Sequence, residues 1–591
     1  MTSKYTLGSW SLADLFETPD APELKETWKK LDQEVADFEQ VRPSLTDDIS
    51  REEFLALISR LEALSEASQR LSGYAELLFS EDVQNQKVLA FLAQVEEFMS
   101  GLANRTLFFE IWWKNLPDDQ AARLMTDVGD HAYWLEAMRR FKPHTLSEPE
   151  EKIINIKDVT GINALNTLYD SLTNRYVFKM QIDGEVKEMA RGELMTHVRQ
   201  GDPAQREAAY RELYRVYGQD GPILGQMYQT VIRDWHGEQV GLRKHSTPMA
   251  VRNLGNDVPD KVVDALLEVC RENAPLFQRF FRLKAHWLGL ERLRRYDLYA
   301  PLSPADKTYD YQTAADLVLE AFAEFHPRVE QSARMVFDQN RLDSLVRKGK
   351  RDGAFCATIT PRLTPWVLVN YQGRANDVAT MAHELGHAVH SILAADHSIF
   401  TAHAPLVLAE TASIFGEMLL IDKILSREQD EAVRRDLLFR QLDDAYATVM
   451  RQAFFALFER RAHDLTREGA TPDDLGEVYF QGLGEQFGDA VDIGDEFRWE
   501  WVSIPHFYHT PFYVYAYSFG QLLVLALYRQ YKKDPSGFKP RYLDILAAGG
   551  SDSPERILRR AGLDISRPEF WKSGFEVIED LLRDLEALPL P

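Results

Sequence analysis

The stretch between residues 377 and 393 constrains this chain most, because its pattern requires a buried helix. Its apolar residues recur at three-to-four spacing, namely Val378, Met381, Ala382, Leu385, Ala388, Val389, Ile392 and Leu393. Asp377 precedes them, where an acid favours the start of a helix. His383, Glu384 and His387 lie among them as His-Glu-x-x-His. Residues four apart share a helix face, so the two imidazoles can bind one metal ion.

Glu384 projects beside the two histidines, where its carboxylate can take a proton from water held at the metal. This arrangement is typical of zinc peptidases. His390 shares the face of His383 and His387, and we expect a buried or hydrogen-bonded histidine there rather than a third ligand. The longer metzincin pattern is absent, because Leu393 stands where its last histidine would be.

A third ligand is expected from residues 406–420, where apolar residues again recur at helical spacing. Glu410, Ser413 and Glu417 fall on one stripe of this expected helix. Acids on an apolar face are costly to bury unless they are paired or bind a metal. One glutamate would therefore bind the metal, and the other would accept a histidine N–H. Spacing leaves open which glutamate does which, and both could instead be ordinary solvated side chains.

Length and composition set the broad class of protein. With 591 residues, 45% of them hydrophobic, the chain can bury a large core in more than one structural unit. Its net charge of −24 argues against nucleic acid or an anionic membrane as partner, since both need a basic footprint. Cys270 and Cys356 cannot form a disulfide framework and suit a reducing compartment. No apolar run suggests a signal peptide or a membrane span, so we expect a cytoplasmic protein.

Helical periodicity dominates the chain, so we expect a mainly α fold. Amphipathic patterns are clearest at residues 22–39, 51–71, 87–109 and 261–290. Residues 175–182 and 185–188 flank Asp183-Gly184, which is typical of a β-hairpin with a tight turn.

A second extended segment, residues 365–371, lies just ahead of the expected metal helix. An exposed sheet edge there could hold an extended peptide through main-chain hydrogen bonds. The segment from Gly353 to Cys356 could supply a loop that approaches the substrate closely, because glycine has no side chain. Plain structural core is the alternative for both segments.

Residues 501–519 are rich in aromatic side chains. Peptide hydrolysis passes through a tetrahedral oxyanion, which neutral hydrogen-bond donors can stabilise. Such donors in this stretch are His506, Tyr513, Tyr515 and Tyr517. If a helix starts after Pro511, Tyr513 and Tyr517 share one face, Tyr515 points elsewhere, and His506 precedes them on a loop. The alternative is an aromatic packing stripe.

These segments together resemble peptidase family M3, most closely the oligoendopeptidase F group and more distantly thimet oligopeptidase. The motifs concerned are Gly353-Ala-Phe-Cys356, residues 367–373 leading into His-Glu-Leu-Gly-His-Ala-Val-His, Ala409-Glu-Thr-Ala-Ser413, and Ile504-Pro-His-Phe-Tyr with Pro511-Phe-Tyr-Val-Tyr. Residues 10–16 and 295–301 also look like its members, so the resemblance spans nearly the whole chain.

The resemblance implies roles for individual residues. It implies one Zn²⁺ per chain, with the ligands His383, His387 and Glu410 and with Glu417 beside them. It implies that Glu384 is the general base and that His506 stabilises the transition state. Tyr513 and Tyr517 both fit the family's tyrosines, and Tyr515 fits in a slightly different alignment.

The resemblance also implies an architecture. The family fold is nearly all helical, with two lobes around a deep channel that admits short peptides, and with a small β-sheet next to the zinc helix. We expect an N-terminal helical domain over residues 1–190, ending in the hairpin, and a catalytic domain over residues 191–591.

The expected function is that of a zinc-dependent oligoendopeptidase that hydrolyses internal bonds of short, unstructured peptides. Glu384 would take a proton from the attacking water and return it to the leaving amine. One alternative is a zinc carboxypeptidase or other exopeptidase, which would need to capture a free terminus. Another is a non-enzymatic helical binding protein with a structural zinc, although no cysteine cluster is present to close such a site. Cys356 could make the enzyme thiol-sensitive or could be buried and inert.

Overall fold

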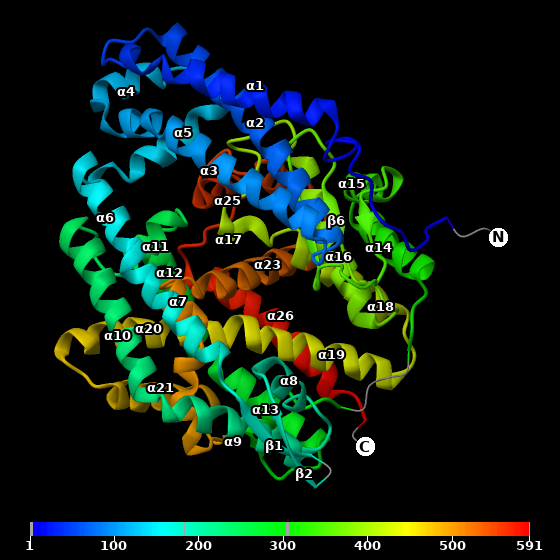
Figure 1. The fold of residues 1–591 in the computed structure, drawn as a ribbon. Coiled ribbons are helices and arrows are strands. Elements are labelled where there is room, and N and C mark those ends of the chain that lie inside the picture. Colours follow the sequence, from blue (N-terminus) through cyan, green and yellow to red (C-terminus); the bar gives the residue numbers. More distant parts are fainter. Residues whose placement is uncertain (1–3, 183, 303–306, 590–591) are drawn as a thin grey trace. The chain divides into compact units, whose positions relative to one another are not determined.

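The structure is a computed structural model that describes residues 4–182, 184–302 and 307–589. Within these residues helices predominate, and the strands form one three-stranded and two two-stranded sheets (Figure 1). The prediction of a mainly α fold is therefore confirmed.

Contacts divide the chain into two compact units, and neither is continuous in sequence. The first unit comprises Met1–Lys142, Lys307–Arg427 and Gln530–Leu563. The second comprises Pro143–Asp306, Glu428–Arg529 and Asp564–Pro591. The two domains expected from the sequence, divided at residue 190, are each continuous in sequence, unlike these units. That boundary stays a prediction.

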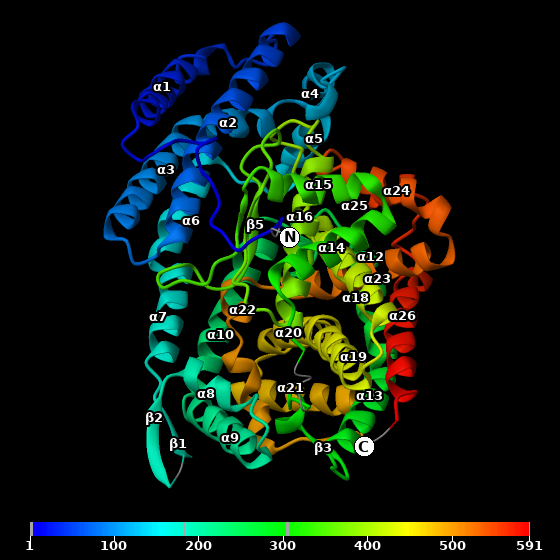
Figure 2. The ribbon, with the colours of Figure 1, turned by 90° about the vertical axis from the view of Figure 1, so that its right-hand side faces the viewer.

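The first unit begins with three long helices, α1 (Pro22–Glu39), α2 (Arg51–Glu81) and α3 (Gln86–Asn115). All three were expected from the periodicity, with α2 extending ten residues further than the pattern indicated. Pro22 is the first residue of α1, where its missing N–H costs no hydrogen bond. α2 packs against α1 and α3 around buried aromatic rings, and the short helices α4 (Asp118–Leu124) and α5 (Ala132–Arg140) follow (Figure 2).

A helical layer around α16 (Ala375–Leu393) completes the first unit. α16 packs against α14 (Tyr311–Phe325), α15 (Pro327–Asp338), α18 (Ser413–Arg427) and α24 (Pro535–Ala547). The short helices of this layer are α17 (Leu406–Ala409) and α25 (Pro554–Arg560). This packing accounts for the apolar stripe that the sequence shows over residues 378–393.

The three-stranded sheet lies against α16. Its order is β4 (Leu342–Asp343), β6 (Trp366–Leu368) and β5 (Phe355–Ala357), with β6 parallel to β4 and antiparallel to β5. The prediction of an extended segment before α16 is confirmed, but its role as an exposed edge is wrong. β6 is the central strand, so its backbone groups already pair on both sides. In the described part of the chain β4 and β5 each pair with β6 alone, so both are edge strands, and β5 is an edge strand that contacts α16.

The second unit is a helical assembly with two small sheets. The hairpin β1 (Phe178–Ile182) and β2 (Glu185–Met189) is antiparallel as expected; Gly184 of its turn has φ +84°, and Asp183 lies outside the described residues. β3 (Leu293–Arg294) pairs with β7 (Val491–Asp492). The helices are α6 (Glu148–Thr160), α7 (Ile162–Asn174), α8 (Arg191–His197), α9 (Pro203–Gln219), α10 (Gly221–Trp235), α11 (Ala250–Gly255), α12 (Asp260–Glu272), α13 (Ala274–Trp287), α19 (Glu431–Ala445), α20 (Arg451–Glu468), α21 (Pro472–Phe487), α22 (Pro505–His509), α23 (Tyr515–Lys533, here up to Arg529) and α26 (Pro568–Glu586).

The prediction of a single helix over residues 261–290 is wrong in the number of helices. The structure has two helices, α12 and α13, with a break at Asn273. Pro275 lies in the first turn of α13, and a proline there lacks the N–H that a continuous helix would need. No helix among the described residues has a window apolar enough for a membrane span.

Candidate metal centre

α16 positions the central motif. The carboxylate of Asp377 accepts the backbone N–H groups of Gln372 and Arg374 at 2.8 and 3.0 Å, which satisfies donors at the start of the helix. Asp377 is thus the first-turn acid that the sequence indicates. About two and three turns further on, His383 and His387 project from the same face.

A glycine brings a second segment close to this face. Gly386 lies between the two histidines, and a Cβ at that position would come within 2.5 Å of the carbonyl oxygen of Ala412. The same Cβ would lie 2.6 Å from the Cα of Ser413. The backbones of α16 and of residues 412–413 therefore touch where a side chain would separate them. We did not predict this contact, although a glycine inside a helical pattern is a signal for close packing.

Glu410 reaches the site from a break between two helices. The single helix expected over residues 406–420 is wrong, since α17 ends at Ala409 and α18 starts at Ser413. Glu410 follows α17 with φ −83° and ψ 3°, and the Ser413 hydroxyl donates to its Oε2 at 2.6 Å. Because of this break, the Glu410 carboxylate points toward the histidines. A residue inside a continuous helix need not point that way.

Three candidate ligand atoms form a nearly equilateral triangle. The Nε2 atoms of His383 and His387 lie 3.2 Å apart, and Glu410 Oε2 lies 3.4 Å from each. A tetrahedral zinc site with ligand bonds of about 2.05 Å has ligand–ligand separations of about 3.3 Å. Among the described residues, this is the group of His, Cys, Asp and Glu side chains placed to hold a metal. The donor set and its spacing fit Zn²⁺ with a fourth position left open.

Glu417 fixes the orientation of His383. Its Oε1 lies 2.5 Å from His383 Nδ1, so this nitrogen donates to Glu417 and Nε2 is the nitrogen that faces the triangle. Burial opposes a charge on His383, but the bond to Glu417 and the charges of Glu410 and Glu384 raise its pKa to about 9. Burial lowers the pKa of His387 and that of His390, the latter to about 4. His390 is buried and lies outside the triangle.

Glu384 is the buried acid next to this triangle, with 7% of its surface exposed. Burial raises the pKa of Glu384 to about 7; the charge of His383 lowers it, while Glu410 and Glu417 raise it. A carboxylate with a pKa near neutrality is suited to accept and return a proton. Burial and the charge of Glu384 raise the pKa of the Cys356 thiol, which favours the unreactive form of that side chain.

A cavity of about 560 Å³ gives access to these groups from one side. Its lining combines His383, Glu384 and His387 with Phe355 and Cys356 of β5. The β5 edge and the two candidate histidine ligands therefore border the same space within the first unit. The expectation that Gly353–Cys356 lies at the cleft agrees with this lining, although we did not identify β5 as the edge.

The aromatic candidates form a cluster in the second unit. His506 lies in α22, and Tyr517 lies in the first turn of α23 with its hydroxyl 3.4 Å from His506 Nε2. The ring of Tyr513 lies 5.9 Å from that of His506 and 5.4 Å from that of Tyr517. Tyr515 is fully buried, and its hydroxyl accepts a hydrogen bond from the side-chain amide of Asn256.

Two details of that stretch differ from the sequence expectation. α23 starts at Tyr515 rather than directly after Pro511, because Phe512 adopts the left-handed conformation with φ +58°. His506 belongs to a short helix rather than a loop. Tyr513 and Tyr517 still come together, because a turn joins the Ala516 N–H to the Tyr513 carbonyl at 3.1 Å.

Comparison with known proteins decides the family. The model of peptidase family M3 matches residues 196–577, and that of oligopeptidase F matches residues 112–178. The chain belongs to peptidase family M3. This membership makes it a metalloendopeptidase, so the alternative of a non-enzymatic binding protein is wrong.

Relatives of this M3 chain match over nearly its full length. It is 28% identical to oligopeptidase PepF of Bacillus subtilis, over 98% of this chain and 87% of the relative. It is 26% identical to an oligoendopeptidase F homolog of Lactococcus lactis, over 100% and 98%. The crystal structure of oligoendopeptidase F from Enterococcus faecium matches with a TM-score of 0.71 at 25% identity, over 96% of this chain and 98% of that one. A crystal structure from Chlamydophila abortus matches with a TM-score of 0.88 at 25% identity, over 98% of both chains.

Proposed function

We propose that this M3 peptidase is a zinc-dependent oligoendopeptidase that cleaves internal bonds of short, unstructured peptides. The observation that carries the proposal is the triangle of His383, His387 and Glu410 with the buried acid Glu384 beside it. The names of the relatives, oligopeptidase and oligoendopeptidase, support short peptides as substrates. A cytoplasmic location is part of the same proposal.

The three residues of the triangle would hold the zinc ion through the two Nε2 atoms and one carboxylate oxygen. When bound, zinc would polarise the scissile carbonyl and lower the pKa of the attacking water. Glu417 keeps the proton of His383 on Nδ1, so that Nε2 is available as a ligand. Ser413 restrains the Glu410 carboxylate by its hydrogen bond of 2.6 Å.

Glu384 would move the proton of the reaction. In its ionised form it accepts a proton from the attacking water, and it then gives that proton to the amine of the leaving peptide. Burial of this side chain by the surrounding protein raises its pKa toward the neutral range that such proton transfer needs. His506, Tyr513 and Tyr517 would donate hydrogen bonds to the developing oxyanion, and the full burial of Tyr515 favours the other two tyrosines for this role.

The substrate would bind as an added strand. The open edge of β5, Phe355–Ala357, offers backbone N–H and C=O groups beside the cavity of the candidate ligands. An extended peptide can pair with such an edge irrespective of most of its side chains. This mode selects unstructured peptides, because a folded protein does not present a free extended backbone.

Glu384→Gln tests the proposal. The variant should retain about one metal ion per chain and lose nearly all turnover, because glutamine cannot accept the proton. His383→Ala should instead lose the metal itself. Metal content by elemental analysis and kcat/KM on a quenched fluorescent peptide would separate the two effects. Full activity in metal-loaded Glu384→Gln would contradict the assigned role.

The exopeptidase alternative is tested with a peptide of about ten residues that is blocked at both ends. An endopeptidase cleaves it internally, whereas an exopeptidase must capture a free terminus. Mass spectrometry of the products identifies the bond that is cleaved. Absence of cleavage of the blocked peptide, with cleavage of the unblocked one, would favour the exopeptidase.

A further inference from the structure

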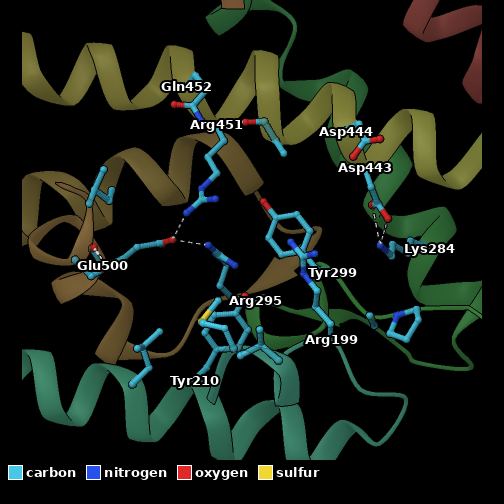
Figure 3. Close-up of a pocket in the computed structure, with 18 of the residues that line it drawn as sticks. Arg199, Tyr210, Lys284, Arg295, Tyr299, Asp443, Asp444, Arg451, Gln452 and Glu500 are labelled. Atoms are coloured by element: carbon cyan, nitrogen blue, oxygen red, sulfur yellow. Dashed lines mark hydrogen bonds and ion pairs between the residues drawn. The ribbon is translucent and has the colours of Figure 1, made fainter. Parts of the chain in front are cut away.

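The second unit contains a cavity of about 600 Å³ whose charged side chains have no role in the reaction outlined above. Its walls come from α9, α13, α19 and α20 and from the segments around residues 295–302 and 500–506. His506, one of the proposed oxyanion donors, is among its lining residues. Figure 3 shows charged side chains from several of these elements pointing toward one another across the space.

Two arginines share one carboxylate in this cavity. Arg295 Nη2 donates to Glu500 Oε1 at 2.7 Å, and Arg451 Nη2 donates to the same oxygen at 3.2 Å (Figure 3). The side chains of Arg295 and Glu500 are each 2% exposed, so they form a buried pair of opposite charge. Arg451 has 30% of its side-chain surface exposed and makes the longer contact. Since Arg295 already neutralises Glu500, the charge of Arg451 is left without an equivalent anion.

Several donors around this pair are unused within the described residues. The Nε and Nη1 atoms of Arg295, Nε of Arg451 and the hydroxyl of Tyr299 are buried there without a hydrogen-bond partner, and so is one acceptor, Oε2 of Glu500. Buried donors without partners are rare in proteins because each costs the free energy of its lost hydration. The arginine side chains are held in place by aromatic rings, with Arg295 over Phe497 at 4.9 Å and Arg451 over Phe455 at 5.0 Å. These donors are therefore fixed before any ligand arrives.

The charges of the lining side chains also favour the binding of an anion. Six Lys and Arg side chains border the cavity against four Asp and Glu side chains, in a protein whose net charge is −24. Lys284 is paired with Asp443 at 2.7 Å, and Arg440 with Asp436 at 3.3 Å, so these cations have anions of their own. A positive cavity in an acidic protein attracts anions from the surrounding solution.

We propose that this cavity binds a carboxylate of the peptide substrate, with Arg451 as the anchoring cation. This proposal rests on the proposed peptidase function and adds a specificity-determining site to it. The carboxylate is either the C-terminus of the peptide or an Asp or Glu side chain, since both present the same planar anion to a guanidinium. A purely structural ion pair would explain Arg295 with Glu500, but it would leave Arg451 charged and accessible.

The test measures binding without turnover. In Glu384→Gln protein, isothermal titration calorimetry compares an N-acetylated octapeptide that ends in a free carboxylate with the same peptide as a C-terminal amide. A second arm compares an internal Glu with Gln in the amidated peptide. We expect the acid to bind about tenfold more tightly than its neutral partner in one arm, as a charge-assisted hydrogen bond provides. The arm that responds identifies the source of the carboxylate.

Arg451→Gln should abolish this preference while the Arg295–Glu500 pair remains in place. The matched control is Arg461→Gln, which removes the same charge from an exposed position on the same helix, α20, and should keep the preference. Should Arg451→Gln fail to fold, Arg451→Lys keeps the charge without the forked geometry and should lower the preference at least about threefold.

Two results would overturn the proposal. One is equal affinity for acid and neutral peptides in both arms with Arg451 intact. The other is a preference that persists in a folded Arg451→Gln variant, or one that Arg451→Lys lowers less than about threefold. Failure of the peptidase proposal has a different signature, because then the unsubstituted protein would cleave none of the four peptides whether or not it binds them selectively.

Discussion

The contact at Gly386 makes the metal centre sensitive to a single methyl group. In Gly386→Ala the new Cβ would lie 2.5 Å from the Ala412 carbonyl oxygen, whereas ordinary contacts begin at 3.4 Å. The two backbones must therefore separate by about 0.9 Å, more than the roughly 0.5 Å that a preorganised site tolerates. Glu410 lies two residues before Ala412, so the separation moves its carboxylate away from the histidines.

The expected consequence is a loss of metal affinity that exceeds the loss of stability. Overpacking of this kind costs about 1–3 kcal/mol, which a chain with such a large core should survive. Ligand displacement should lower the affinity for zinc at least about tenfold, in the range of changes to residues that support metal ligands. Activity should then recover when zinc is supplied in excess.

The assay is a zinc titration against a chromophoric chelator, together with kcat/KM at several zinc concentrations and a thermal melt. The matched control is Gly101→Ala, because Gly101 lies inside α3 and a Cβ there meets nothing within 4 Å. That control should keep zinc affinity and gain about 1 kcal/mol from helix propensity. Unchanged zinc affinity in Gly386→Ala would refute the argument that this close contact sets the ligand triangle.

Three further changes test the surroundings of the site. Glu417→Gln should lower zinc affinity about 10- to 100-fold, measured by chelator competition, because a neutral amide accepts the Nδ1–H of His383 more weakly than the carboxylate does. At acid pH, kcat/KM should follow the ionisation of Glu384 and fall about tenfold per pH unit below its pKa. Burial raises this pKa to about 7, and a bound dication would lower it. A profile of kcat/KM that stays flat down to about pH 4 would contradict this role. Glu459 accepts the Phe512 N–H at 2.9 Å, and burial raises its pKa to about 8. The pKa of this acid is higher in the folded protein than in the unfolded chain, so the stability of the folded state falls as pH rises from about 4.5 to about 8. The gain in melting temperature of Glu459→Gln should therefore grow over that pH interval and level off above it.

Much of the fold could be predicted because local patterns determine it. The helices α1, α2 and α3 follow from their apolar spacing, and Pro22 marks the first of their boundaries. Where a proline interrupts a periodic pattern, as Pro275 does between α12 and α13, periodicity alone predicts one helix too few. The order of strands in the sheet beside α16 could not be predicted, because pairing partners far apart in sequence leave no local pattern.

The candidate site divides in the same way. His383, Glu384 and His387 could be identified from spacing within one helix, and the resemblance to family M3 supplied Glu410. The break that turns Glu410 toward the histidines was not predicted, because the sequence pattern continues through it. The cavity of the second unit that we propose to bind a carboxylate was not predicted from the sequence. Its residues Arg295, Arg451 and Glu500 are ordinary charged residues until the fold brings them together.

The discontinuity of the first unit has a consequence for protein synthesis. α24 belongs to the segment Gln530–Leu563, packs against α16, and its Tyr542 hydroxyl donates to the carbonyl oxygen of Thr411 next to Glu410. The metal centre therefore lacks part of its support until residue 563 has left the ribosome, long after the histidines themselves have emerged. A growing chain thus carries an incomplete peptidase until α24 has been synthesised.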